Sequence, residues 1–284
     1  MTKGFQKPAN NLQEVSLPHP GIIDSKSFNK HFQLCCYKPS PDLEPFVVHI
    51  WVQRQLSRPT QKPPIEILSG PNIYLFFTAE AAFIHGITRH EFEYDASASE
   101  VVAGVKFRPG GLHPFLRKSV RELDTSMPPI TSVFPAATET FRNELLDQPD
   151  EIVVTRLEAL LRSRQPAQDI SLELVTKILH ALDNDTSLRT VGSIAQSFHM
   201  SERSLQLLFQ THVGVGLKWI ITRKRLLETI GQIKERPGSF QAAATTELGY
   251  NSQSHFTREF KDVIGRSPSQ YLKGLTTTVE STSS

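Results

Sequence analysis

Between Cys35 and Phe107, hydrophobic residues gather in short runs rich in β-branched and aromatic side chains. Segments containing Pro, Gly or Asn, such as Ser69–Asn72, separate most of these runs. Short runs with turn residues between them predict an antiparallel sheet or a small barrel. The predicted strands are Val47–Gln53, Ile65–Leu68, Ile73–Thr78, Ala82–Ile87 and Val101–Phe107.

After the predicted strands, the hydrophobic positions recur at the three- and four-residue intervals of amphipathic helices. We expect helices at Pro135–Leu146 and Glu151–Arg164, and Leu157 and Leu161 of the second would face inward. The segment Arg162–Gln168 is the expected hinge to the C-terminal part of the chain.

A helical unit then occurs twice. In the second copy, a short helix from about Gln241 to Leu248 is followed by Gly249, which suits the left-handed backbone of a helix end. The next helix buries Phe256 and Phe260 as one apolar stripe and carries polar residues on its opposite face. This spacing is typical of a helix-turn-helix, in which the second helix enters the DNA major groove.

The first copy lies 51 positions earlier, so that Leu205 corresponds to Phe256. Its helices are predicted at Thr190–Phe198 and Ser201–Phe209, and Ser201 would cap the second of them.

One helix, Leu217 to about Lys234, is predicted between the copies, with Ile220 facing inward and the basic run Arg223-Lys224-Arg225. Pro237-Gly238 would end it. A continuous helix would hold the two units at a fixed separation, and adjacent major-groove segments on one face of B-DNA lie about 34–36 Å apart.

The C-terminal pattern, over about Ile170–Leu275, resembles the DNA-binding domain of the AraC/XylS family of bacterial transcription regulators. The second copy carries the more specific match. Its residues at the signature positions are Leu248-Gly249-Tyr250, Gln253-Ser254-His255-Phe256, Arg258, Phe260-Lys261 and Gly265-x-Ser267-Pro268-x-x-Tyr271. The chain departs from the family pattern at four places. Ala244-Thr245 stands where Ile-Ala is common, and His199 stands where a turn glycine is common. Leu207 and Gly216 stand where an arginine and a proline are common.

The resemblance implies a sequence-specific transcription regulator that binds double-stranded DNA, with RNA polymerase and a second copy of the chain as further partners. Arginine pairs with guanine, glutamine pairs with adenine, and an exposed leucine can pack on a thymine methyl group. By position, the residues expected to contact bases are Arg203, Gln206, Leu207, Gln253, Ser254 and Arg258. Those expected to contact phosphates are Lys218, Arg223, Lys261 and Arg266.

The N-terminal half resembles an uncharacterised β-rich domain that is often fused to AraC-type DNA-binding domains. The residues that carry this resemblance are Tyr37-Lys-Pro-x-Pro-x-Leu43, Trp51 and Gly104-Val-Lys-Phe-Arg-Pro-Gly-Gly111. The resemblance implies that this half senses a small-molecule effector or mediates dimerisation. The candidate effector-binding residues are Trp51, Tyr74, Arg108 and His113.

Composition is compatible with these expectations. The net charge is +2 over 284 residues, divided as +4 over residues 170–275 and −2 over the rest. We find no apolar run of about 18 residues and no apolar signal core at the N-terminus, so we expect a cytoplasmic protein without a membrane segment. The adjacent Cys35 and Cys36 are expected to be ordinary thiols.

Two other classes of function stay open. An enzyme fused to a DNA-binding domain is disfavoured, because His85 and His90 would lie on opposite faces of a strand and no His-x-His pair is present. We therefore predict no catalytic residue, metal ligand or cofactor. Gly110-Gly111 could cradle an anion, but a tight turn is the expected structure. The second alternative is an adaptor that uses the helical repeat for protein contacts.

The expected fold class is α+β, with an antiparallel β-rich sheet and flanking helices before an all-α domain of two helix-turn-helix units. The expected segments are an extended arm at 1–30, the β-rich regulatory domain at 31–165, the DNA-binding domain at 170–275 and a disordered tail at 276–284.

Overall fold

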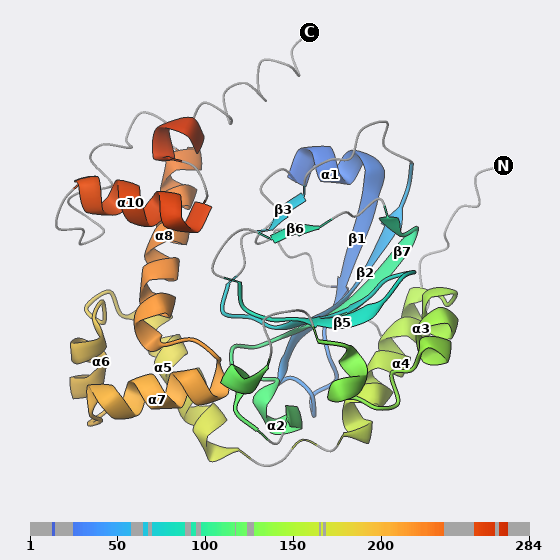
Figure 1. Cartoon of the computed structure of the whole chain (residues 1–284), viewed down its shortest axis with the longest axis horizontal. Coiled ribbons are helices and arrows are strands. Elements are labelled where there is room, and N and C mark those ends of the chain that lie inside the picture. Colours follow the sequence, from blue (N-terminus) through green and yellow to red (C-terminus); the bar gives the residue numbers. More distant parts are fainter. Residues whose placement is uncertain are drawn as a thin grey trace, which may run out of the picture.

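A computed structural model shows the architecture of the chain (Figure 1). It describes residues 13–14, 25–57, 65–67, 70–88, 92–94, 98–116, 118–123, 128–164, 166, 169–235, 253–264 and 267–271. An antiparallel sheet in the N-terminal half precedes a C-terminal helical region, so the predicted α+β class is confirmed. Among the described helices, none is both long enough and apolar enough to cross a membrane.

The main sheet has five strands in the order β1-β2-β7-β4-β5, and every neighbouring pair is antiparallel. A separate ribbon pairs β3 with β6. The bounds are β1 Phe32–Tyr37, β2 Val47–Gln55, β3 Ile65–Ile67, β4 Tyr74–Phe77, β5 Ala82–His85, β6 Phe92–Tyr94 and β7 Val101–Phe107. All five predicted strands are present: β7 has the predicted ends and the other four have shifted ends, whereas β1 and β6 were not predicted.

The expectation of an extended arm is wrong over its last residues, because Ser25–His31 form helix α1. Phe28 is buried and packs on Phe32 at a ring-centroid distance of 5.1 Å. One buried aromatic side chain thus attaches this helix to the start of β1. Most of the remaining arm and the whole predicted tail lie outside the described residues.

One face of the sheet forms the main hydrophobic core with the helices that follow it. Residues such as Leu75 and Val105 are fully buried there, together with Leu157 and Leu161 as predicted. The helices of this half are α2 His113–Leu116, α3 Glu139–Leu146 and α4 Asp150–Ser163, with the short 3-10 helices η2 Val120–Glu122 and η3 Ile130–Ser132. In Figure 1, α3 and α4 lie on one side of the sheet.

The helices predicted at Pro135–Leu146 and Glu151–Arg164 are confirmed as α3 and α4, and local hydrogen bonds explain where they begin. Helix α3 begins four residues later than Pro135, because the Thr138 hydroxyl caps it by accepting from the Phe141 N–H. Asp150, in the first turn of α4, accepts from the Tyr37 hydroxyl at 2.6 Å and pairs with Arg54 at 2.6 Å. These bonds attach α4 to β1 and β2.

The opposite face of the sheet carries an aromatic cluster. Trp51 meets Phe76 edge to face at 5.1 Å, and Phe76 stacks on Phe83 at 5.3 Å. Gly104 makes room for this packing, since a Cβ at that position would lie 2.5 Å from the Trp51 ring and 2.3 Å from the Leu75 carbonyl oxygen. Gly104, one of the residues that carry the N-terminal resemblance, therefore has a packing role.

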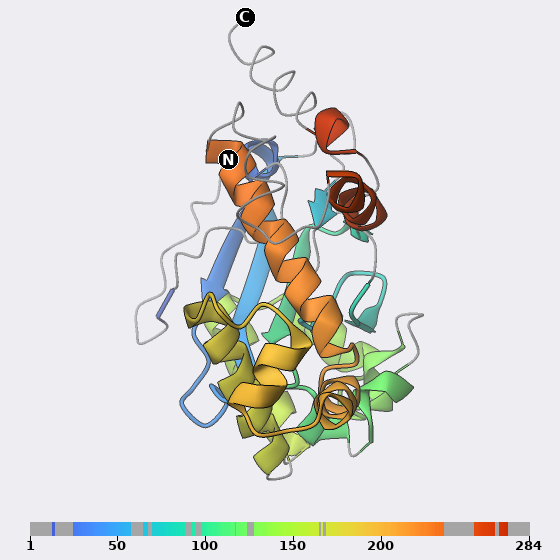
Figure 2. The same cartoon turned by 90° about the vertical axis from the view of Figure 1, so that its left-hand side faces the viewer.

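Helices α5 Ile170–Asn184, α6 Val191–Ser197, α7 Glu202–His212, α8 Leu217–Glu235 and α10 Gln253–Ile264 make up the C-terminal region. Figure 2 shows α8 along its length, from the level of α7 up to that of α10. The predicted connecting helix is confirmed, and its Ile220, Ile221 and Leu226 are buried. The predicted helix at Gln241–Leu248 lies outside the described residues.

Candidate nucleic-acid interface

The first helical unit is built as its sequence predicts. Thr190 and Ser193 form a reciprocal capping box at the start of α6, and the Ser201 hydroxyl accepts from the Ser204 N–H at 3.0 Å to cap α7. Between the two helices, His199 takes a left-handed backbone with φ 51°. The histidine thus adopts a left-handed turn conformation that glycine takes more readily.

Helix α7 has one buried and one exposed face. Leu205 and Phe209 are fully buried in the C-terminal core, whereas Arg203 is exposed and Leu207 is 64% exposed. Gln206 is half-buried, and a Cβ on Gly216 would lie 2.5 Å from its side-chain oxygen. Arg203 and Leu207 therefore present the more accessible contacts, while Gln206 lies against the turn before α8.

Helix α10 repeats this division. Phe256 and Phe260 are fully buried, and Phe260 also packs on Tyr271 at 5.7 Å. Ser254 and Arg258 are exposed on the outer side. Gln253 is the first residue of α10, but its side chain lies outside what the structure describes.

The segment after α10 packs against the buried face of this helix. The Ser267 hydroxyl accepts from the Gln270 N–H at 3.3 Å, as expected for a helix cap before Pro268. Pro268 and Tyr271 are both buried. The segment Ser267–Tyr271 thus holds α10 in place.

The two outer helices lie at opposite ends of α8 (Figure 1). Lys218, near the start of α8, and Lys261, on α10, are exposed and remain candidates for phosphate contact. Arg266 lies outside the described residues.

The phosphate role expected for Arg223 is wrong, because this side chain is only 1% exposed. Its guanidinium lies over the Trp219 ring, 5.6 Å from the centroid. Lys224 donates to the Leu182 carbonyl and pairs with Asp183 at 2.8 Å, and Arg225 donates to the Arg189 carbonyl. The basic run therefore points inward and attaches α8 to its neighbours.

The four effector candidates are not brought together in one site. Trp51 and Tyr74 both border the aromatic cluster around Phe76. Arg108 lies at a turn, where its Nε donates to the Glu44 carbonyl at 2.7 Å. His113 instead lies on α2, with its Nδ1 2.7 Å from an Asp169 carboxylate oxygen.

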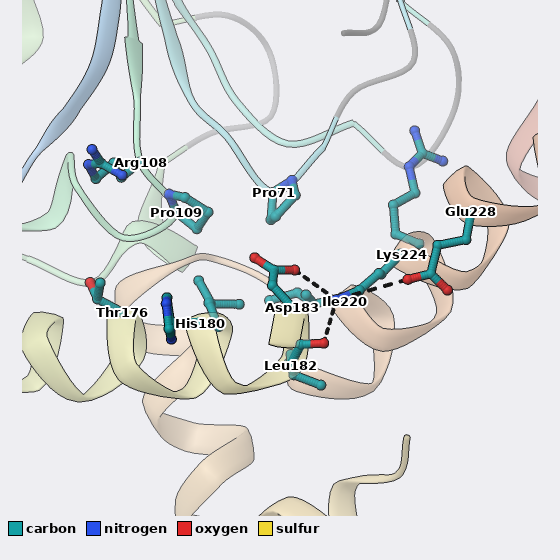
Figure 3. Close-up of a pocket in the computed structure, with 12 residues that line it drawn as sticks. Pro71, Arg108, Pro109, Thr176, His180, Leu182, Asp183, Ile220, Lys224 and Glu228 are labelled. Carbon is teal, nitrogen blue, oxygen red and sulfur yellow. Dashed lines mark hydrogen bonds and ion pairs between the residues drawn. The ribbon is translucent and has the colours of Figure 1, made fainter. Parts of the chain in front are cut away.

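Arg108 borders a pocket of about 470 Å³ between the two halves of the chain. Figure 3 shows Arg108, Pro71 and Pro109 on one side and residues of α5 and α8 on the other. Lys224 is held there by Asp183 and Glu228, at 2.8 and 3.9 Å. The pocket is thus lined by the exposed Arg108 and by Lys224, whose charge is already paired with Asp183 and Glu228.

The glycine pair beside Arg108 forms a turn. Gly110 has φ 82°, and the Gly111 N–H donates to the Arg108 carbonyl at 2.8 Å. This amide is therefore used within the turn, in agreement with the expected tight turn. Both cysteines are free thiols, and burial raises the pKa of Cys36 to about 11, so its thiolate is disfavoured at neutral pH.

A capped helix pair with a left-handed turn and a polar outer helix face fits the helix-turn-helix motif. Comparison with known families agrees, since residues 194–274 match the helix-turn-helix domain family. Residues 36–128 match a domain of unknown function (DUF6597).

Curated relatives are similar over the C-terminal part. An uncharacterized HTH-type transcriptional regulator of Haemophilus influenzae is 33% identical over 34% of this chain and 32% of the relative. A putative AraC-like transcription regulator of Streptomyces antibioticus is 33% identical over 30% of this chain and 27% of the relative. The chain therefore matches about a third or less of these relatives' length.

Among solved structures, ToxT from Vibrio cholerae is 14% identical, with a TM-score of 0.36, over 86% of this chain and 97% of that one. The chain therefore carries a segment that matches the helix-turn-helix domain family, after a segment that matches a domain of unknown function, and one relative of the helix-turn-helix segment is named AraC-like.

Proposed function

We propose that this protein is a sequence-specific DNA-binding transcription regulator whose two helix-turn-helix units dock into successive major-groove segments. The observation that carries the proposal is the two-faced character of both outer helices. Helices α7 and α10 each bury a pair of large apolar residues and expose an arginine, Arg203 or Arg258, on the other side. The relatives are named as transcription regulators, which favours a regulator over an enzyme.

The exposed side chains suit the edges of base pairs. Arg203 and Arg258 can each donate two hydrogen bonds to a guanine, and Leu207 can pack on a thymine methyl group. Ser254, exposed at the start of α10, can bond to either kind of base edge. We keep Gln206 and Gln253 as adenine contacts, and Gln206 would have to turn away from Gly216 on binding.

Phosphate contacts would fix the position of the protein on the duplex. Lys218, Lys261 and Arg266 remain in this role, together with backbone N–H groups at the starts of α7 and α10. Contacts of this kind add affinity for any sequence and make binding depend on salt.

Control by the N-terminal half is supported by its contact with the first recognition helix. Helix η2 packs on α7, and the Ser119 hydroxyl donates to the Thr211 carbonyl at 3.4 Å. Gly214, with φ 96°, lies so close that a Cβ there would be 2.9 Å from Val120. A shift of the N-terminal half would therefore reach α7 directly.

We place the effector site at the pocket beside Arg108, because residues from both halves of the chain line this pocket. A small molecule with an anionic group would pair with Arg108 and contact α5 and α8 together. Contacts with RNA polymerase and with a second copy of the chain stay predictions.

The proposal is tested by the affinity of the full chain for duplex DNA at several salt concentrations. We expect tighter binding at lower salt, and Lys261→Ala should weaken binding to all sequences and reduce the log–log slope by about one. Lys177→Ala, which removes an exposed lysine of α5, serves as the matched control and should leave the slope unchanged. Failure to bind duplex DNA at low salt would favour the adaptor alternative.

A further inference from the structure

Three side chains that are far apart in the sequence meet where the two halves of the chain join. His113 comes from α2, Asp169 caps the start of α5, and His212 is the last residue of α7. The His113 Nδ1 lies 2.7 Å from Asp169 Oδ2, and the His212 Nε2 lies 3.6 Å from Asp169 Oδ1. Each residue offers one possible metal-ligand atom, a ring nitrogen or a carboxylate oxygen, and these three atoms lie within 4.8 Å of one another.

The hydrogen bonds of His212 leave its Nε2 facing the Asp169 carboxylate. Its Nδ1 lies 2.9 Å from the Leu208 carbonyl oxygen, which can only accept, so Nδ1 carries the proton. In the neutral imidazole, Nε2 then has a lone pair and faces a carboxylate oxygen. Two acceptors 3.6 Å apart are too distant to share a short hydrogen bond, and a cation between them would satisfy both.

The outer partners also match those of a metal site. Metal-binding histidines usually donate their second ring N–H to a carbonyl or carboxylate, as His212 does to Leu208. Binding carboxylates are usually hydrogen-bonded as well, and Asp169 Oδ1 accepts from the Ser171 and Leu172 N–H groups at 3.0 and 3.2 Å. Both side chains are therefore oriented by the backbone before any ion binds.

The group is sheltered from solvent and its dimensions are suitable. The side chains of His113, Asp169 and His212 are 20%, 12% and 11% exposed. Ligand atoms at about 2.0–2.2 Å from a tetrahedral Zn²⁺ lie about 3.3–3.5 Å from each other. The 3.6 Å separation, to Asp169 Oδ1, is close to this value. The 2.7 Å contact, to Asp169 Oδ2, would open by about 0.6–0.8 Å as the ion replaces the shared proton.

We propose that His113, Asp169 and His212 bind a divalent transition-metal ion of the Zn²⁺ class, with a fourth position left for water. Imidazole and carboxylate together suit such ions, and three protein ligands with one open position are a common zinc arrangement.

The ion would connect the two halves of the chain. His113 belongs to the N-terminal half, whereas His212 ends the first recognition helix, so the complete ligand set exists only while the halves are docked. An ion that binds only this state stabilises it by mass action. The effect on DNA binding rests on the proposed function, but metal binding itself does not.

The test is a zinc titration of the untagged full chain after removal of metal with a chelator, with Cys35 and Cys36 replaced by serine. We expect one Zn²⁺ per chain. The variants His113→Gln and His212→Gln should weaken binding by at least about 100-fold, more than the loss of an outer partner costs. His31→Gln, which changes a histidine at the end of α1, is the matched control and should bind like the parent.

Asp169→Asn keeps an oxygen that can cap α5 while removing the charge, so it tests the site in a chain that still folds. This variant should also lose Zn²⁺ affinity. A second readout is Co²⁺ in place of Zn²⁺: the parent with bound Co²⁺ should show the intense visible absorption of tetrahedral coordination, and the variant should not. The proposal is overturned if the parent binds Zn²⁺ no more tightly than a chain with both His113→Gln and His212→Gln. Neither outcome depends on DNA.

Discussion

At the scale of single residues, Arg258 carries the most specific prediction of the proposed base recognition. It is exposed on α10, on the side opposite the buried Phe256 and Phe260. Its planar guanidinium can make two hydrogen bonds to guanine O6 and N7, a geometry that lysine lacks.

We therefore expect Arg258→Ala to cost about 1–3 kcal/mol on the preferred sequence and to relax selectivity at one base position. The measurement compares affinities for the preferred duplex and for duplexes mutated at each position. An equal loss on preferred and random DNA would assign Arg258 to phosphate contact instead.

Gly104 has a structural role in the N-terminal half. Gly104→Ala would force the Trp51 ring or the β4 backbone to move, since both lie under 3 Å from the added Cβ. We expect a loss of unfolding free energy of about 1–3 kcal/mol. Gly86→Ala is the control, because an added Cβ there meets nothing within 4 Å. Denaturant melts that gave equal stability for both variants would contradict this packing role.

Among the secondary-structure elements, helix α6 depends on its start. Thr190 caps it by accepting from the Ser193 N–H at 3.0 Å. Thr190→Ala should lower the unfolding free energy by about 0.5–2 kcal/mol, whereas Thr190→Ser keeps the hydroxyl and should recover most of the loss. Thermal melts of the two variants make the comparison, and identical melts would show that the cap contributes nothing.

The main sheet should be sensitive to acid. Burial lowers the pKa of both His49 and His85 from 6.5 to about 4. Between these values the unfolded chain binds more protons, so the unfolding free energy should fall as pH decreases from about 6.5 to about 4.

His85→Phe should reduce this pH dependence, because each proton accounts for about 1.4 kcal/mol per pH unit. A phenyl ring suits the site, since His85 already meets the Phe76 ring edge to face at 6.1 Å. Denaturant melts across this pH range provide the measurement. A slope unchanged from that of the parent would show that His85 has the same pKa in the folded and unfolded states.

Local patterns predicted these elements well, because caps and apolar stripes depend on residues a few positions apart. Thr190, Ser201 and the buried Leu205 and Phe209 are examples. The inward direction of Arg223 could not be predicted, because it depends on how α8 packs. The meeting of His113 with Asp169 and His212 also lacked a local signal, since 56 positions separate the first two.

In the whole molecule, the two halves are joined at the C-terminal end of α7. Helix η2 packs on α7, and the Ser119 hydroxyl bonds to the Thr211 carbonyl. The second outer helix, α10, lies at the far end of α8 from this junction (Figure 1). The N-terminal half is thus placed to act on one unit more directly than on the other.

The most direct test of the account is selection of bound duplexes from a random DNA pool by the full chain. Two short motifs with centres about one helical turn, 10–10.5 base pairs, apart are the predicted result. Repeating the selection with Arg258→Ala should degrade one motif, and Arg203→Ala should degrade the other. A pool with no enriched sequence, or one motif unchanged by both substitutions, would contradict recognition by two helix-turn-helix units.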